Sequence, residues 1–251
     1  MNILAINGSP RKTNGITGLL LEKFLAGATE AGANVETILL ADEKIHHCTG
    51  EFHCWIKTPG RCLWDGKDGD TMAELRKKIA DADCLVLATP VYVDGMTGLM
   101  KNMFDRCIPN VMPFMELDQN ENVRHPIRFG KPGGKIVLIS TCGFVEMDTF
   151  GPLVYHMERI ALNLRGEMAG KLLRPSGMGL RIEGFFPDVR EKVLAAFTKA
   201  GAELIKQGGV SPETEAEASQ EFMPNMPKEL FVKGGNAFWE RAVKEGSLQS
   251  D

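Results

Sequence analysis

The sequence predicts an α/β fold: a doubly wound, five-stranded parallel sheet of order 2-1-3-4-5, with helices on both faces and a C-terminal extension. Two observations lead to it. Strand and helix patterns alternate from Met1 to Gln207, as is typical of a parallel sheet covered by its crossover helices. Right-handed crossovers then leave few strand orders, and 2-1-3-4-5 is the common one for this pattern.

Five short apolar runs predict the strands. They are Asn2–Asn7, Asn34–Leu40, Cys84–Thr89, Lys135–Ser140 and Glu167–Leu173. The first ends at Gly8, Ser9 and Pro10, which interrupt regular structure. The third is an unbroken apolar run of the kind that is buried on both faces in parallel sheets.

Five segments with apolar side chains at helical spacing predict the helices. They are Gly15–Ala31, Asp70–Ala82, Thr97–Cys107, Phe150–Leu164 and Asp188–Gln207. In the first, Leu20 and Phe24 share one face. In the second, Asp70 is expected to cap the N-terminus.

The pattern changes after Gly208, so we expect a domain over residues 1–208 and an extension over 209–251. Ser211–Glu221 holds acidic residues and no basic one, and Asn236–Val243 is expected to form a short helix. A disordered tail is the alternative. Aromatic residues, which are scarce in disordered segments, argue for an extension that packs on the domain or on a neighbouring subunit.

Composition excludes several classes of function. The 251 residues are 43% hydrophobic and 25% charged, which suits a water-soluble domain with a proper core. A net charge of −4 argues against a nucleic acid or an anionic membrane as the main partner. No apolar run approaches a membrane span and no charged n-region precedes the first strand, so we expect no signal peptide and a cytoplasmic location.

The loop after the first strand carries anion-binding groups. Ligands of a 2-1-3-4-5 sheet bind outside the carboxyl ends of strands one and three. There, Ser9, Arg11 and Thr17 bring hydroxyls and a guanidinium to a helix N-terminus, which favours an anion. This set suits a terminal monophosphate, because the glycine patterns that bind a pyrophosphate or a triphosphate are absent. An ordinary polar loop with a capping residue is the alternative.

The loop after the third strand has the character of a ring-binding surface. Val91, Tyr92 and Met96 supply an apolar wall, and a tight turn at Gly95 is expected to direct backbone N–H groups outward. An isoalloxazine ring needs such apolar contact together with hydrogen-bond donors. The alternative makes Tyr92 a core aromatic residue and Met96 a gap-filler.

Three short motifs carry a family resemblance. Gly8-Ser9-Pro10-Arg11-Lys12, with Pro90-Val91-Tyr92 and Lys101-x3-Asp105-Arg106, resembles the flavodoxin-like NAD(P)H-dependent FMN reductases, and most closely the branch with the iron–sulfur flavoproteins. The resemblance spans about Met1 to Gln207 and implies FMN as cofactor. It implies that the FMN-binding residues are Ser9, Arg11, Ile16, Thr17, Pro90, Val91, Tyr92, Asp94, Gly95, Met96, Thr141 and Gly143. Cys142, beside Gly143, is expected to be a small buried side chain without a redox role.

Cys48, Cys54 and Cys62 fall within one short stretch, C-x2-E-x2-C-x7-C. The iron–sulfur flavoproteins that the chain resembles have a fourth cysteine where this sequence has Glu51, and four thiolates are the normal complement of a [4Fe–4S] cluster. Three interpretations follow: an intact or oxygen-ligated cluster, a zinc site completed by His47 or His53, or a metal-free loop. The sequence favours the metal-free loop.

The resemblance implies an oxidoreductase that passes electrons from NAD(P)H through FMN to a small-molecule acceptor such as a quinone or a flavin. No side chain is needed as an acid or base, and none is assigned a catalytic role. The alternative is a non-enzymatic electron carrier between partner proteins, of the flavodoxin type or the iron–sulfur flavoprotein type.

Three segments predict a homodimer or homotetramer, because an open flavin face tends to be covered by a partner. The segment between Ile108 and Lys131 is too long for a simple connection and is rich in apolar residues. With the Cys48–Trp64 loop and the aromatic tail Phe222–Trp239, it is expected to wall the flavin site of a neighbour. The alternative is that these segments fold over their own domain.

Overall fold

The computed structural model describes residues 1–182 and 184–247 of the chain. Its centre is a five-stranded sheet of order β2-β1-β3-β6-β7, in which every neighbouring pair is parallel. The strands are β1 (Asn2–Asn7), β2 (Asn34–Leu39), β3 (Cys84–Pro90), β6 (Lys135–Thr141) and β7 (Glu167–Arg174). Because β6 and β7 are the fourth and fifth strands of this sheet, the predicted order 2-1-3-4-5 is confirmed.

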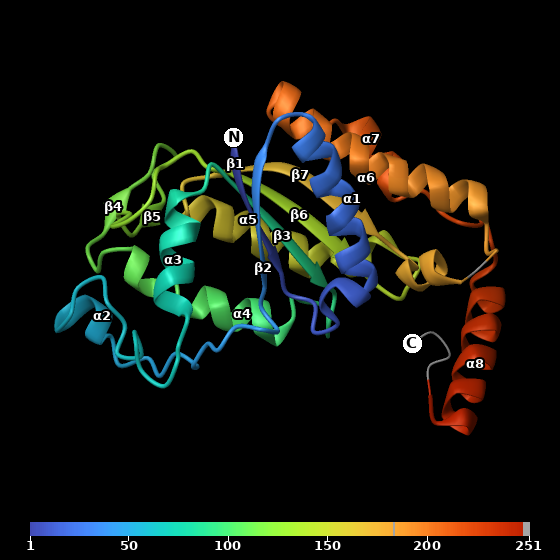
Figure 1. Cartoon of the computed structure of the whole chain (residues 1–251), viewed down its shortest axis with the longest axis horizontal. Coiled ribbons are helices and arrows are strands. Elements are labelled where there is room, and N and C mark those ends of the chain that lie inside the picture. Colours follow the sequence, from blue (N-terminus) through green and yellow to red (C-terminus); the bar gives the residue numbers. More distant parts are fainter. Residues whose placement is uncertain (183, 248–251) are drawn as a thin grey trace.

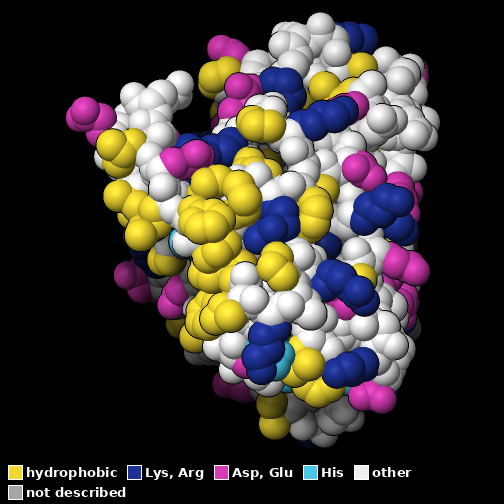
Figure 2. All heavy atoms as spheres, turned by 90° about the vertical axis from the view of Figure 1, so that its left-hand side faces the viewer, with side chains coloured by type: hydrophobic (Ala, Val, Ile, Leu, Met, Phe, Trp, Pro, Cys, Tyr) yellow, Lys and Arg dark blue, Asp and Glu magenta, His cyan; other side chains and the backbone are white. Residues whose placement is uncertain are grey.

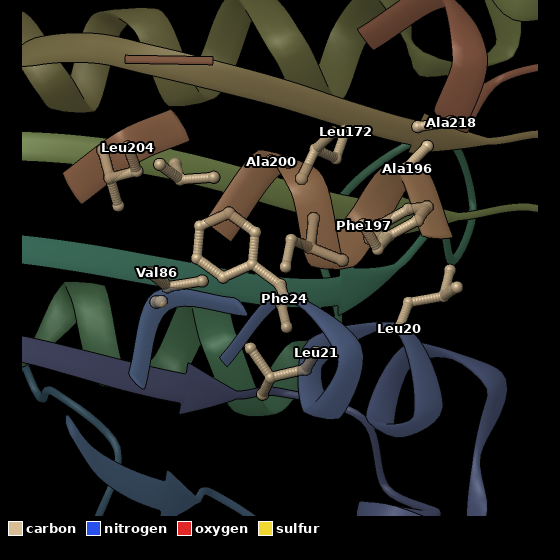
Figure 3. Close-up of a cluster of buried hydrophobic side chains, with 14 of the residues drawn as sticks. Leu20, Leu21, Phe24, Val86, Leu172, Ala196, Phe197, Ala200, Leu204 and Ala218 are labelled. Atoms are coloured by element: carbon tan, nitrogen blue, oxygen red, sulfur yellow. The ribbon is translucent and has the colours of Figure 1, made fainter. Parts of the chain in front are cut away.

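Helices cover both faces of the sheet (Figure 1), which confirms the predicted layers. The helix α1 (Ile16–Glu30) and the helix α6 (Pro187–Gln207) lie on one face, where Phe24 and Phe197 pack among side chains of β3 and β7 (Figure 3). The other face buries apolar residues of α3 (Met72–Asp81), α4 (Gly98–Asp105) and α5 (Gly151–Asn163). Alternate residues of β1, β3 and β6 therefore belong to two separate cores.

Two glycines let α1 and α6 approach closely. A Cβ atom added at Gly27 would lie 1.8 Å from the carbonyl oxygen of Thr198, and one at Gly201 would lie 1.9 Å from that of Phe24. Both distances are far inside van der Waals contact, so only glycine fits at either position. This packing holds α1, and with it the loop before α1, against the sheet.

Short elements lie in the connections between the main ones, and two further helices form the C-terminal extension. The short elements are η1 (Lys12–Asn14), α2 (His53–Ile56), η2 (Ile108–Asn110), β4 (Glu116–Leu117), β5 (Val123–Arg124), η3 (Met147–Phe150) and η4 (Gly177–Arg181). The helices of the extension are α7 (Pro212–Ala218) and α8 (Lys228–Glu245). The strands β4 and β5 form a separate antiparallel hairpin inside the long segment noted in the sequence.

The first part of the C-terminal extension packs on the domain. Thr214 and Ala218 of α7 are buried, and the Glu215 carboxylate accepts the backbone N–H of Lys171 in β7 at 2.6 Å. Farther on, the buried Arg174 guanidinium donates to the carbonyl of Gln220 at 2.5 Å and lies over the ring of Phe222. In contrast, α8 stands away from the sheet (Figure 1) and has no buried residue. It is longer than the predicted helix Asn236–Val243, which it contains.

One predicted helix start is wrong. The sequence places the cap of the second helix at Asp70, but α3 begins at Met72 with Thr71 at the N-cap position. Asp70 does accept the Met72 N–H, at 3.1 Å, yet its carboxylate is buried and mainly pairs with Arg106. Asp70, which the local sequence pattern assigns to a helix cap, instead forms a long-range ion pair with Arg106.

Within the described residues, no helix combines the length and the apolar character that crossing a membrane requires.

Candidate functional site

Three loops meet at the carboxyl ends of β1, β3 and β6. The Thr97 hydroxyl donates to the carbonyl of Gly8 at 2.7 Å, which ties the loop after β3 to the loop after β1. The hydroxyls of Thr17 and Thr141 are 3.1 Å apart and tie the first loop to the loop after β6. The structure therefore brings together the three segments in which the sequence places the FMN-binding residues.

The loop after β1 is folded tightly against the start of α1. The buried Ser9 donates its N–H to the side chain of Asn7 at 2.8 Å, and Asn7 donates in turn to the carbonyl of Lys12 at 3.1 Å. Gly15 stands at the N-cap of α1 and has no side chain with which to cap the helix. The first N–H groups of α1 therefore keep their capacity to bind an anion, and the positive end of the helix dipole favours one.

The predicted phosphate-binding side chains surround this helix end. Thr17 is buried in the first turn of α1, Ile16 is half-buried and Arg11 is exposed. Arg181 of η4 also reaches this loop, where its guanidinium donates to the carbonyl of Asn14. Sequence analysis missed Asn7, Thr97 and Arg181. Of these three residues, only Arg181 adds a positive charge to the loop. It lies far from the loop in sequence, so local sequence patterns do not reveal this contact.

The loop after β3 makes a strained turn at residues other than the one expected. Val93 has φ +48° and Asp94 has φ +60°, whereas Gly95 is not in the left-handed region. The N–H of Gly95 also does not turn outward, since it donates to the carbonyl of Tyr92 at 3.2 Å. The expected tight turn is present, because Tyr92 and Gly95 pair across it, but its left-handed residues are Val93 and Asp94 rather than Gly95. A β-branched residue with positive φ is a rare, costly conformation that is concentrated at functional sites.

This turn presents groups that a flat ring can use. The N–H groups of Val93 and Asp94 make no hydrogen bond to another described residue. Tyr92 is 50% exposed, so it is not a core aromatic residue. Val91 is half-buried, and Pro90 ends β3 in register with Thr141. Met96 is buried in the core on the α4 side, so its expected place in the apolar wall is wrong and the alternative, a gap-filler, describes it.

The loop after β6 is the third of these segments. Gly143 is exposed with open space where a Cβ would stand, and Phe144 beside it is 63% exposed. Cys142 is buried, and its thiol donates to the carbonyl of Phe144 at 3.3 Å. Burial raises the pKa of the Cys142 thiol, so it stays protonated at neutral pH. This agrees with its expected role as a small buried side chain.

A hollow lies at the far end of α4. It is shallow and opens to solvent, and its lining includes Cys48, Glu51, Cys54 and Cys62. The rest of its wall is formed by Gly50, Phe52, Asp105, Arg106, Ile108 and Pro109. Burial, and then the nearby charges of Cys62, Glu51 and Cys48, raise the pKa of the Cys54 thiol. Three cysteines of one short stretch of sequence thus line the same hollow as the carboxylates of Glu51 and Asp105.

A buried ion-pair network holds the loop that carries these cysteines. Arg106 donates to both carboxylate oxygens of Asp70, at 2.8 and 3.1 Å, and to the carbonyl of His46 at 2.7 Å. Arg76 forms a similar two-pronged pair with Asp65, which also accepts the N–H of Cys62 at 2.9 Å. Of the motif Lys101-x3-Asp105-Arg106, only Arg106 is buried, while Lys101 and Asp105 pair on the surface.

The charge state of Asp70 follows from this network. Burial raises the pKa of Asp70, but hydrogen bonds from Arg106 and then from His46 outweigh it and lower that pKa from 3.8 to about 2. The carboxylate therefore remains charged across the physiological range and anchors the cysteine loop to α4.

Comparison with known proteins adds family information. The model of a family described as NADPH-dependent FMN reductase matches residues 1–141. An iron–sulfur flavoprotein of Archaeoglobus fulgidus is 32% identical over 146 residues, 58% of each chain. One of Methanocaldococcus jannaschii is 36% identical over 110 residues, 43% of this chain and 53% of the relative. The chain thus spans a little over half the length of these curated relatives.

Solved structures share the fold at low sequence identity. An FMN-dependent NADH-azoreductase from Bacillus anthracis, in complex with FMN, has a TM-score of 0.59 at 13% identity, covering 82% of this chain and 99% of its own. An NAD(P)H:quinone oxidoreductase from Methanothermobacter marburgensis has a TM-score of 0.57 at 22% identity, covering 81% and 98%. A flavone reductase has a TM-score of 0.56 at 20% identity, covering 100% and 93%.

Proposed function

The chain belongs to the NADPH-dependent FMN reductase family, and we propose that it binds FMN across the three loops and passes electrons from NAD(P)H to a small acceptor. One observation carries the proposal. The N-terminal end of α1 and the unpaired N–H groups of Val93 and Asp94 follow the neighbouring strands β1 and β3, and the hydrogen bond from Thr97 to Gly8 joins these two loops.

The loop before α1 suits the phosphate end of FMN, and the loop after β3 suits its ring. Ser9, Arg11 and Thr17 surround the N–H groups of α1 and would hold the phosphate. The turn at Val93 and Asp94, with the exposed ring of Tyr92 beside it, would hold the isoalloxazine and donate to its polar edge. When bound, the flavin supplies the redox chemistry, accepting a hydride and releasing one or two electrons. The protein supplies position, an open stacking face and hydrogen-bond donors.

We propose a quinone or a free flavin as the acceptor. Family membership supports a small acceptor, and one structural neighbour is named a quinone oxidoreductase. Steady-state assays of the FMN-loaded chain with NADPH or NADH test this class. Multiple turnovers of quinone reduction are expected. A chain that stabilises a flavin semiquinone but turns over neither nucleotide would instead be an electron carrier.

A second candidate function is that of an iron–sulfur flavoprotein electron carrier, favoured by the hollow that Cys48, Cys54 and Cys62 share. The helix α4 runs from the proposed flavin-binding loops to this hollow, since Thr97 caps its N-terminus and Arg106, which lines the hollow, follows its last residue. Eight helical residues span about 12 Å, so a redox group in the hollow would lie near the flavin. Such a group would supply single-electron transfer to a partner.

We further propose a homodimer or homotetramer in which α8 and the β4–β5 hairpin contact a neighbouring copy and wall its flavin site. Figure 2 shows apolar side chains gathered in a band over the face that carries the hairpin. Phe114, Met115 and Leu117 are each more than 60% exposed there. On α8, Trp239 is 54% exposed and Val243 79% exposed. Exposed apolar surfaces of this kind mark protein–protein contacts.

A further inference from the structure

A cavity lies at the amino ends of β3 and β6, the opposite end of the sheet from the proposed flavin-binding loops. Leu85 near the start of β3 and Lys135 at the start of β6 line it. The N-terminus of the chain, marked in Figure 1, lies at the same end of the sheet. The seven residues of β3 span about 20 Å, so the cavity is separate from the proposed flavin site.

The walls of this cavity are mainly apolar. The helix α3 forms one wall, and the segment that leads from η2 to β6 forms another. Apolar side chains in these walls include Ile79, Ala80, Ile127, Phe129 and Leu164. The cavity holds about 70 Å³ of free space and opens to solvent. An apolar cavity of about 150 Å³ takes up a whole benzene molecule, so this one suits one end of a small ring whose other end stays at the mouth.

One polar side chain is buried in the apolar wall. Asn110 of η2 is 5% exposed and lines the cavity. Its Nδ2 donates to the carbonyl of Arg76 at 3.4 Å, but its Oδ1 accepts no hydrogen bond from another described residue. Buried polar atoms nearly always have a partner. The Oδ1 atom of Asn110 is therefore suited to accept a hydrogen bond from a hydroxyl group in the cavity.

The mouth of the cavity carries a positive charge. Lys131 lines the cavity, and its ammonium group forms no ion pair with another described residue. Lys135 also lines it, but its ammonium group pairs with Glu167 at 2.7 Å. The backbone N–H groups of Gly130 and Gly134, which also line the cavity, make no hydrogen bond to another described residue. An ammonium group beside such N–H groups suits an anionic oxygen.

We propose that this cavity binds a small aromatic carboxylate that carries a hydroxyl group on the far side of its ring. The ring enters between α3 and the segment before β6, and its hydroxyl donates to Oδ1 of Asn110. The carboxylate stays at the mouth, against the ammonium group of Lys131. Each of the three parts of such a ligand thus has a matching feature in the cavity: a buried acceptor, an apolar wall and a cation.

Isothermal titration of the FMN-loaded chain with 4-hydroxybenzoate tests this inference. We expect one binding site per chain. Benzoate lacks the hydroxyl and phenol lacks the carboxylate, so each is expected to bind about threefold to tenfold more weakly, as the loss of one hydrogen bond predicts.

Two variants separate the cation from the apolar wall. Lys131→Ala is expected to weaken 4-hydroxybenzoate and benzoate by about threefold and to leave phenol unchanged, because only the first two are charged. Lys77→Ala removes the same charge from an exposed position of α3 outside the cavity and is the control. Ala80→Leu fills the cavity and is expected to abolish binding of all three compounds, whereas Ala80→Ser keeps the cavity open.

Thermal unfolding and FMN occupancy show whether Ala80→Leu is folded. If it is not, the different responses of benzoate and phenol to Lys131→Ala still test the site. Wild-type protein that binds none of the three compounds would overturn the inference, as would equal responses of benzoate and phenol to Lys131→Ala. A change in the flavin absorbance on binding would place the ligand at the flavin instead. A lower mass of Ala80→Leu by light scattering would assign the cavity to a neighbouring copy, which also contradicts the inference.

Discussion

The hydroxyl of Thr97 donates to the carbonyl of Gly8 at 2.7 Å, across the point where the strand order of the sheet reverses. Both groups are buried, and the Thr97 hydroxyl also accepts the N–H of Met100 at 3.3 Å, which caps α4. One side chain therefore fixes the loop after β1, the loop after β3 and the start of α4.

Replacement of Thr97 by Val tests this relationship. Valine keeps the shape but leaves the buried Gly8 carbonyl without its donor and α4 without its cap. We expect the free energy of unfolding to fall by about 1–3 kcal/mol and FMN to bind more weakly. Urea denaturation and flavin titration measure the two effects. Thr97→Ser retains the hydroxyl and is the matched control, so equal losses in both variants would argue against the hydrogen bond.

Replacement of Arg11 by Ala tests the proposed contact between Arg11 and the FMN phosphate. FMN carries a phosphate and riboflavin does not, so the variant is expected to bind FMN roughly tenfold to a hundredfold more weakly, with little effect on riboflavin. The neighbouring Lys12 pairs with Asp42, so Lys12→Ala changes the net charge equally and serves as the control. Equal weakening of both ligands in Arg11→Ala would place Arg11 away from the phosphate.

Stability is expected to fall in acid because of Asp70. Its pKa is lowered from 3.8 in the unfolded chain to about 2 in the folded one. The carboxylate therefore stabilises the fold fully above about pH 4, and this contribution, about 2 kcal/mol, is lost as the pH falls toward 2. Denaturation of the wild type and of Asp70→Asn at a series of pH values measures it.

Asp70→Asn is expected to cost about 3–5 kcal/mol at neutral pH, since it leaves the Arg106 cation buried without its carboxylate. The difference between the variant and the wild type should shrink between pH 4 and pH 2. A constant difference over that range would contradict the lowered pKa of Asp70.

Removal of α8 tests the proposed assembly. A chain that ends before Lys228 loses a helix with no buried residue, so its domain is expected to stay folded while the oligomer dissociates. Light scattering at micromolar concentration measures the mass. Trp239→Glu is expected to weaken assembly, and Lys233→Glu on the polar side of α8 is not. A mass near 27.6 kDa for the intact chain would contradict the proposal.

Much of the fold is readable from local pattern. The five strands and the five main helices were predicted to within one or two residues at most ends, because the buried runs and the helical spacing reflect two-sided burial. The β4–β5 hairpin was not predicted, since each of its strands has two residues and no alternating pattern forms over so short a length. The start of α3 was misplaced because Asp70 serves Arg106, a partner that local sequence does not reveal.

The candidate site was located by topology more than by motif. The point where the strand order reverses identified the loops after β1 and β3 as the ligand-binding loops. In the structure, the hydrogen bond from Thr97 to Gly8 joins these two loops. It was not possible to foresee that Val93 and Asp94, rather than Gly95, take the positive φ values, because glycine is the residue that tolerates them best. Arg181 lies far along the chain, and only the packing of η4 brings it to Asn14.

We propose that this chain holds FMN at the loops after β1, β3 and β6 and reduces it with NAD(P)H. Anaerobic mixing of the FMN-loaded protein with NADPH in a stopped-flow spectrophotometer tests it most directly. We expect the absorbance of oxidised flavin to disappear in a single turnover, with a rate that rises and then saturates with NADPH concentration. Flavin that stays bound and oxidised in the presence of both NADPH and NADH would contradict the account.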